Sequence, residues 1–289
     1  MEQTLELAEL KLKIAERQPL SCAENRVAEF VVTHFEQLPY LGIEEVAKRS
    51  EASKTSVGRF VQNIGFQGFS RFKKAVVLHL QNTHIKTPSR IASRLNAPEE
   101  DVPISAKSYL KELEQTFSSL ASTFDEAGFE QALDLFANKN SALYVFGPSS
   151  SNGLATYFTM LTRYVREDVR HLTPDVTLLP HHLLDMKAGD TLFVISYYRY
   201  SDVAVKLVEW FHSKGGKVIV LTNHGVNPYT PYCHVQLLVQ SDSMGVFQSR
   251  VTGLAVVEAL VNALTQRIGI PERFDALENI LSDFDTFHY

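Results

Sequence analysis

The sequence predicts two domains of different class: an all-α domain of short helices, then an α/β domain whose mostly parallel sheet is covered by helices on both faces. Three observations lead to this prediction. Residues 20–80 show helical periodicity and no strand pattern, whereas short apolar runs alternate with helical stretches from residue 142 onward. A polar connector with three prolines lies between these parts, and 289 residues are ample for two domains. We expect the helical domain at 1–82, the linker at 83–107 and the α/β domain at 108–289.

The composition is typical of a soluble globular protein, with 45% hydrophobic and 21% charged residues. No apolar run reaches the roughly eighteen residues of a membrane span, and the charged N-terminal stretch lacks the apolar core of a signal peptide. Cys22 and Cys233 lie far apart, without the spacing of a zinc site or a disulfide framework. We therefore expect a cytoplasmic protein that needs no membrane, metal or cofactor.

Basic residues are concentrated in one segment of an otherwise acidic chain. From Lys48 to Arg90 there are nine basic residues and one acid, Glu51, which gives this segment a charge of +8. The whole chain carries −5, so the remainder carries −13. Such a basic block indicates either a module that binds a polyanion or a solvated basic face.

Two short helices are predicted close together in the first domain, at 43–50 and 53–64, after an earlier helix that starts at the capping box Ser21-Cys-Ala-Glu24. Only Glu51 and Ala52 would lie between the two short helices, which fits a helix-turn-helix motif. Many such motifs have glycine in the turn, so the shape of a turn that contains Glu51 stays open.

In a helix-turn-helix motif the second helix enters the major groove of DNA, and its exposed face makes the contacts. Here Val57 and Phe60 account for the buried side of that helix. Phe66, Phe69 and Phe72 are expected to be core anchors rather than wedges between bases. The exposed positions carry residue types that bind phosphates or read base edges. The predicted DNA-binding residues are Ser53, Lys54, Thr55, Ser56, Arg59 and Gln62 on this helix, and Arg71, Lys73 and Lys74 beyond it.

The second domain begins with helical stretches and continues with alternating strands and helices. The helical stretches lie at 109–124 and 129–137, and short apolar runs predict strands at 142–146, 191–195, 217–221 and 235–239, with a weaker one at 169–172. This alternation indicates a mostly parallel sheet. A long apolar helix at 249–266 is expected to pack on the sheet or at a dimer seam.

Two strand-to-helix loops in this domain are rich in hydroxyl groups. They are Phe146-Gly-Pro-Ser-Ser-Ser-Asn-Gly153 and Ile195-Ser-Tyr-Tyr-Arg-Tyr-Ser-Asp202. Since loops at the carboxyl ends of parallel strands share one edge of the sheet, we expect them to converge on a crevice for an anion or a polyol. Ordinary helix caps with spare serines are the alternative. His181, His182 and His224 are expected to be structural or surface residues rather than metal ligands.

One part of the chain resembles a known family. The run Val46-Ala-Lys-Arg-Ser-Glu-Ala-Ser-Lys-Thr-Ser-Val-Gly-Arg-Phe60 and the following Ile64-Gly-Phe-Gln-Gly-Phe-Ser-Arg-Phe-Lys73 are similar to the N-terminal helix-turn-helix domain of RpiR-type bacterial transcriptional regulators. The resemblance implies a C-terminal SIS (sugar isomerase) domain that senses a phosphosugar. It also implies a homodimer or homotetramer that binds a double-stranded DNA operator and controls genes of sugar or sugar-acid metabolism.

The first serine-rich loop is similar to the Gly-x-Gly-x-Ser loop of SIS domains. That pattern falls on Gly147, Ser149 and Ser151, so serine stands at the second glycine position. The resemblance implies that these serines, with Ser150, bind an anionic effector.

The second loop departs further from its SIS counterpart, Ser-x-Ser-Gly-x-Thr. The pattern falls on Ser196, Tyr198, Arg199 and Ser201, so tyrosine replaces the middle serine and arginine replaces the glycine. Arg199 could offer a bidentate guanidinium to a phosphate or carboxylate in place of backbone amides. The predicted effector-binding residues are Ser149, Ser150, Ser151, Ser196, Arg199 and Ser201.

Two other functions stay open beside that of a ligand-responsive regulator. If Tyr197, Tyr198 and Tyr200 fill the pocket, the SIS-like domain is a dimerisation scaffold. A sugar-phosphate isomerase would need a positioned general base, for which Glu258 and His224 are the candidates. They do not form a convincing pair, and we expect no enzymatic activity.

Overall fold

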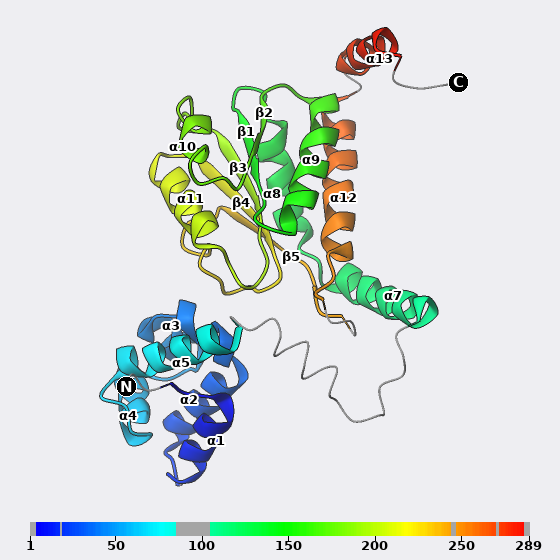
Figure 1. Ribbon diagram of the computed structural model, residues 1–289. Coiled ribbons are helices and arrows are strands. Elements are labelled where there is room, and N and C mark those ends of the chain that lie inside the picture. The colour runs from blue at the N-terminus through cyan, green and yellow to red at the C-terminus, as the bar shows by residue number, and fades with distance from the viewer. Residues whose placement is uncertain (1–3, 18, 85–104, 244–246, 270–271, 286–289) are drawn as a thin grey trace. The chain divides into compact units, whose positions relative to one another are not determined.

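The computed structural model describes residues 4–17, 19–84, 105–243, 247–269 and 272–285 (Figure 1). The chain divides into two compact units, which we call the helical unit (Met1–Asp101) and the sheet unit (Val102–Tyr289). Most of the predicted linker falls at residues 85–104, outside the described residues, so its boundaries stay a prediction.

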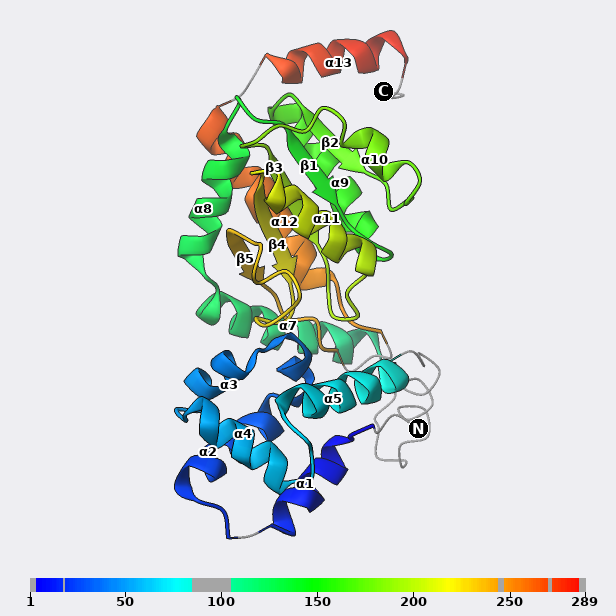
Figure 2. The same ribbon diagram turned by 90° about the vertical axis from the view of Figure 1, so that its left-hand side faces the viewer.

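The helical unit contains short helices, as its sequence predicts. They are α1 (Leu7–Ala15), α2 (Cys22–Thr33), the 3-10 helix η1 (Phe35–Tyr40), α3 (Ile43–Arg49), α4 (Lys54–Asn63) and α5 (Phe69–His84). The capping box at the start of α2 is present, because Ser21 accepts a hydrogen bond from the Glu24 amide while the Glu24 carboxylate accepts one from the Ser21 amide. Helices α2, α3 and α4 pack on one another (Figure 2).

The core of the helical unit uses the side of α4 that the periodicity assigns to it. Val57 and Phe60 are fully buried. Phe66 and Phe72 are buried too, and their rings meet edge to face at 5.4 Å. These two aromatic residues are therefore core anchors, as predicted, and the opposite side of α4 is left exposed.

The sheet unit is an α/β domain with a five-stranded parallel sheet, which confirms the predicted fold class. Its strands are β1 (Leu143–Phe146), β2 (Val169–Leu172), β3 (Thr191–Ile195), β4 (Lys217–Thr222) and β5 (Val235–Leu238). Its helices are α7 (Ala106–Thr123), α8 (Glu126–Ala137), α9 (Ser151–Val165), α10 (Leu179–His182), α11 (Asp202–Ser213), α12 (Val251–Ile268) and α13 (Arg273–Asp283).

Helices cover both faces of the sheet, so its central strands are buried throughout. α8, α9 and α12 lie on one face, and α10 and α11 on the other (Figure 1). Alternate strand residues face opposite layers: Val145 and Ile195 belong to the core under α9 and α12, whereas Phe146 and Val194 belong to the core under α11. This double burial explains why the strands read as continuous apolar runs.

The strand order, β2-β1-β3-β4-β5, places a topological switch point between β1 and β3. From β1 the chain runs through α9 to β2, on one side of β1. It then returns through α10 to β3, on the other side of β1. In open parallel sheets the crevice outside the carboxyl ends of two such strands is the usual ligand site. Here β1 and β3 lead directly into the two serine-rich loops.

Within the described residues no single helix is both long and apolar enough to cross a membrane. Only α12 and α13 taken together, as a bent pair, meet that criterion, and one face of α12 is buried in the core of the sheet unit.

Candidate nucleic-acid interface and effector crevice

The turn between α3 and α4 has the left-handed residue that such a turn needs, although it contains no glycine. Glu51 adopts a φ of 50°. Arg26, from α2, donates a hydrogen bond of 2.8 Å from Nη2 to the Glu51 carbonyl oxygen. Glutamate tolerates this backbone conformation poorly, and the hydrogen bond from α2 helps to hold the turn in it.

The predicted DNA-reading face of α4 is exposed. Thr55, Arg59 and Gln62 point away from the core, as does Lys54. The Lys54 ammonium forms an ion pair with the Glu44 carboxylate of α3. A DNA phosphate that binds Lys54 would have to compete with this acid.

The two serines at the start of α4 bond to each other. The Ser53 hydroxyl accepts from the Ser56 amide at 3.0 Å and lies 2.9 Å from the Ser56 hydroxyl. These hydroxyls form the helix cap and fix the N-terminal turn, so they contribute to α4 itself as well as to any DNA contact.

An acidic group lies beside Arg59. Asn63 donates a hydrogen bond of 2.6 Å to the Glu24 carboxylate. The pKa of Glu24 is lowered, mainly by the hydrogen bonds from Ser21 and to a smaller extent by Asn63 and the charge of Arg59. Glu24 thus stays ionised and provides a fixed negative charge next to the arginine.

The three basic residues predicted beyond α4 differ in exposure. Arg71 and Lys74 are exposed on α5. Lys73 is half-buried, and its ammonium donates to the Leu41 carbonyl oxygen at 3.0 Å. Burial lowers the pKa of Lys73. This ammonium is held inside the helical unit, whereas those of Arg71 and Lys74 face outward.

In the sheet unit, the loop after β1 is tightly wound. A Cβ on Gly147 would lie 2.5 Å from the Ser151 carbonyl oxygen, so only glycine fits at that position. Ser149 adopts a φ of 51°, the left-handed conformation that glycine favours. Ser149 and Ser150 are exposed, and Ser151 is buried.

The loop after β3 has the same feature. Arg199 adopts a φ of 75°, and its side chain is exposed. Ser149 and Arg199 stand where the SIS-like patterns have glycine. Both positions therefore have the backbone conformation that glycine favours.

The serines at the two helix N-termini flanking the switch point are not used as caps. At α2, α4 and α7 the preceding serine accepts a hydrogen bond from the helix backbone. Among the described residues, the corresponding serines of α9 and α11, Ser150 and Ser201, form no side-chain cap hydrogen bond. The Ser150 hydroxyl instead accepts a 3.5 Å hydrogen bond from Arg250, and both serines lie in the loops that follow β1 and β3.

Ser196, by contrast, points into the protein interior. It is 1% exposed, and its hydroxyl lies 2.7 Å from that of Tyr229. Extending the alternation of β3 explains this, because Ser196 continues the series of Leu192 and Val194 toward the α11 layer.

The three tyrosines of the second loop do not form one plug, because they separate between the two layers. Tyr197 belongs to the core under α9 and α12. Tyr200 packs against the opposite core, with its ring 5.4 Å from that of Tyr229. The Tyr198 ring packs edge to face on the His224 ring, and their centroids lie 5.1 Å apart.

One basic residue that contacts both serine-rich loops was not predicted from the sequence. Arg250, at the N-cap of α12, reaches Ser150 in the first loop and stacks over the Tyr197 ring in the second. It lies 100 residues from Ser150 in the chain, and no local motif marks it.

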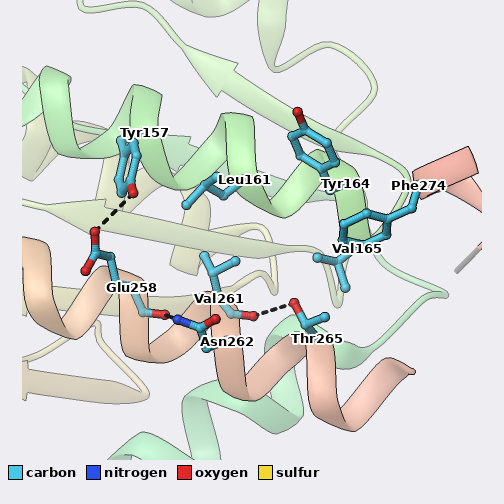
Figure 3. A pocket seen from close by; sticks show the side chains of 9 residues that line it. All are labelled: Tyr157, Leu161, Tyr164, Val165, Glu258, Val261, Asn262, Thr265 and Phe274. Carbon is cyan, nitrogen blue, oxygen red and sulfur yellow. Dashed lines mark hydrogen bonds between the residues drawn. The ribbon is translucent and has the colours of Figure 1, made fainter. Parts of the chain in front are cut away.

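The two residues considered as general bases have separate neighbours. Glu258 lies in a groove between α9 and α12, where it accepts a hydrogen bond of 3.0 Å from the Tyr157 hydroxyl (Figure 3). His224 packs on Tyr198. The part of the chain that the structure describes contains no group of three or more side chains suited to a metal ion.

Comparison with known proteins bears on both units. Residues 9–83 match the family described as "Helix-turn-helix domain, rpiR family", and residues 135–263 match the SIS domain. The chain is 24% identical over 262 residues to the HTH-type transcriptional regulator HexR of Escherichia coli K12, which covers 86% of this chain and 85% of HexR. An HTH-type transcriptional regulator of Caldanaerobacter subterraneus is 24% identical over 250 residues, covering 85% of this chain and 86% of that protein.

Solved structures share the fold. The Vibrio vulnificus NanR protein, determined in complex with ManNAc-6P, covers 96% of this chain and 99% of its own, with 16% identity and a TM-score of 0.58. The sugar isomerase domain of an RpiR transcription factor from Sphaerobacter thermophilus covers 62% of this chain and 97% of its own, with 19% identity and a TM-score of 0.54. With a helix-turn-helix domain of the rpiR type followed by a SIS domain, the chain belongs to the RpiR family of transcriptional regulators.

Proposed function

We propose that this regulator responds to an anionic, sugar-derived effector, a phosphosugar in the first instance, bound at the switch point between β1 and β3. The observation that carries the proposal is the pair of left-handed turns, at Ser149 and Arg199, beside the serines that do not cap α9 and α11. Hydroxyls that cap no helix, together with a helix N-terminus at this edge of a parallel sheet, suit an oxyanion. The NanR complex with ManNAc-6P supports the same class of ligand.

The effector contacts we assign are the hydroxyls and amides of Ser149, Ser150, Ser151 and Ser201. Ser196 is left out because its hydroxyl is buried against Tyr229. Arg199 stands where the SIS pattern has glycine, and it adopts a left-handed backbone with a φ of 75°, so we assign to it the shape of the loop rather than the contact with the anion.

For DNA we propose that α4 enters the major groove of an operator. Thr55, Arg59 and Gln62 are the base-reading candidates, while Lys54 contacts phosphate in exchange for Glu44. Arg71 and Lys74 of α5 contact the backbone, and Lys73 does not. Two copies of the chain would present two α4 helices to half-sites about one helical turn apart, and effector binding would change their relative arrangement through a difference in affinity.

A thermal-shift screen of the purified chain tests the effector assignment. Sugar phosphates, sugar acids and the matching free sugars are compared, because stabilisation of about 2.7 kcal/mol is expected when the free ligand is at about a hundred times its Kd. We expect phosphosugars to raise the unfolding temperature and the free sugars to have little effect. If no anion stabilises the chain at millimolar concentration, the sensor assignment fails.

The tyrosine-rich loop favours a second candidate. Since the Ser196 hydroxyl is buried against Tyr229, part of the SIS-like phosphate cup is filled by protein. If protein fills the whole cup, the sheet unit would serve only to join copies of the chain. A chain that binds operator DNA as an oligomer, yet responds to no anion, would have this function.

A further inference from the structure

Arg250 is a partly buried cation whose hydrogen bonds are long. Nη2 lies 3.5 Å from the Ser150 hydroxyl, and Nη1 lies 3.4 Å from the Gln248 side-chain oxygen and 3.3 Å from the Ser249 carbonyl oxygen. Well-formed bonds of this type are about 2.7–3.2 Å long. Nε is buried and has no hydrogen-bond partner among the described residues. A guanidinium has five N–H donors in a fixed fork, so Arg250 is poorly satisfied.

The charge of Arg250 has no protein counter-ion in the described part of the chain. None of the ion pairs there includes it, whereas Arg267 of the same helix pairs with both Glu130 and Asp134. Burial lowers the pKa of Arg250. Its main compensation is the face of the Tyr197 ring, whose centroid lies 3.9 Å from Cζ. A partly desolvated cation without a carboxylate is unfavourable, and an incoming anion would relieve this cost.

Tyr197 holds the guanidinium in a defined place. The residue is 4% exposed, and its hydroxyl has no hydrogen-bond partner among the described residues. A Cβ on Gly253 would lie 1.9 Å from that hydroxyl oxygen, so the phenol packs directly on the first turn of α12 and needs glycine there. The ring is therefore a rigid platform, made from the second loop, on which Arg250 rests.

The same guanidinium reaches the first loop. Ser150, to which Nη2 points, precedes α9, and no side chain caps that helix among the described residues. An oxyanion beside Ser150 would lie at the positive end of the α9 dipole and could accept hydrogen bonds from Arg250 in a fork geometry. Arg250 thus contacts both serine-rich loops, and its charge lies beside the position proposed for the oxyanion.

We propose that Arg250 is the residue that binds the oxyanion of the effector, whether a phosphate ester or a sugar-acid carboxylate, and so discriminates against the uncharged sugar. This inference rests on the proposed effector function and adds to it the residue that supplies the charge. It differs from the assignment made from sequence, in which Arg199 supplies the charge.

The test measures ligand binding and ligand-free stability of the full chain in parallel. Hexose 6-phosphates, the matching sugar acids and the free hexoses are titrated against the wild type and the variants Arg250→Gln, Arg250→Lys and Arg199→Gln. Arg267→Gln is the matched control, because it removes the same charge from the last turn of α12, far along the helix from its N-cap. Circular dichroism establishes that each variant is folded.

We expect Arg250→Gln to weaken the anionic ligands at least tenfold and to leave the free hexoses unaffected, with Arg250→Lys intermediate. The ligand-free unfolding temperature of Arg250→Gln should not fall, because a cation without a counter-ion has been removed. A purely structural arginine would show the reverse: lower stability and unchanged affinity. Whichever anion binds identifies the phosphate or the carboxylate as the group recognised.

Two results overturn the inference in distinguishable ways. If the wild type binds an anionic ligand and Arg250→Gln binds it equally well, Arg250 is not the contact, although the effector function stands. A tenfold loss in Arg199→Gln alone would assign the charge to that residue. If the wild type binds none of these anions, both the effector function and the role of Arg250 are wrong.

Discussion

Substitutions at Arg199 measure directly what the left-handed backbone of the second loop costs the folded chain. The Arg199 φ of 75° lies in the left-handed region, which costs an ordinary L-residue about 1–2 kcal/mol. Replacing arginine by alanine removes the side chain and retains that cost, while replacement by glycine removes both. The difference between the two variants therefore isolates the backbone contribution.

We expect Arg199→Gly to be more stable than Arg199→Ala by about 1 kcal/mol. Glycine relieves the backbone strain, but part of this gain is lost because glycine also gives the unfolded chain more conformational entropy. For a unit the size of the sheet unit this corresponds to roughly 2–4 °C in the unfolding temperature. Thermal unfolding of the full chain, followed by circular dichroism and calorimetry, measures it. Lys206, which is exposed within α11, is the control position. There Lys206→Ala should be more stable than Lys206→Gly by about 1 kcal/mol.

Ligand binding provides the second half of the same experiment. If the loop backbone, rather than the Arg199 side chain, contributes to the effector crevice, both variants should bind an anionic ligand within a few-fold of wild type. The reasoning is refuted if Arg199→Gly is less stable than Arg199→Ala. It also fails if both variants lose binding together, because the guanidinium would then be the contact.

The remaining predictions concern individual side chains. Glu44→Gln should strengthen DNA binding several-fold at low salt in a fluorescence-anisotropy titration, because Lys54 loses its competing acid. Arg71→Ala should reduce the slope of log K against log salt by about 0.9, whereas Lys73→Ala should leave that slope unchanged and lower the stability of the helical unit. Ser196→Ala should cost about 1–3 kcal/mol by leaving the buried Tyr229 hydroxyl without this partner, with little change in effector affinity; an effector loss without a stability loss would contradict this.

The fold could be predicted from the sequence because each level of pattern agrees. The central strands are buried on both faces, so they appear as apolar runs, and the first short helices are bounded by capping residues such as Ser21 and Ser53. The positions of the two loops follow in turn, since a loop after a parallel strand must lie at the carboxyl edge of the sheet. These inferences need only local sequence and topology.

The destinations of side chains within the second loop could have been predicted as well. Continuing the alternation of β3 by two residues sends Ser196 toward the α11 layer and Tyr197 toward the α12 layer, where the structure has them. The family-like pattern instead suggested that Ser196 binds the effector. A periodicity that applies to every strand is here a better guide to that side chain than a motif.

Arg250 could not be found in this way. Its significance depends on Ser150 and Tyr197, which belong to two other segments of the chain, and on the absence of a carboxylate near it among the described residues. The sequence around it shows only the start of a long apolar helix. Long-range proximity and the lack of a counter-ion are properties of the folded chain, so they become visible only with the structure.

Three turns at the proposed DNA and effector sites share a left-handed backbone. Within the described residues, five non-glycine residues have positive φ, and three of them, Glu51, Ser149 and Arg199, lie in the helix-turn-helix turn and the two serine-rich loops. This conformation costs a residue other than glycine about 1–3 kcal/mol. Glycine would adopt the same conformation without that cost. We therefore expect the proposed DNA and effector contacts to depend on the path of the backbone at these three turns, in addition to the Ser149 hydroxyl that we assign to the effector.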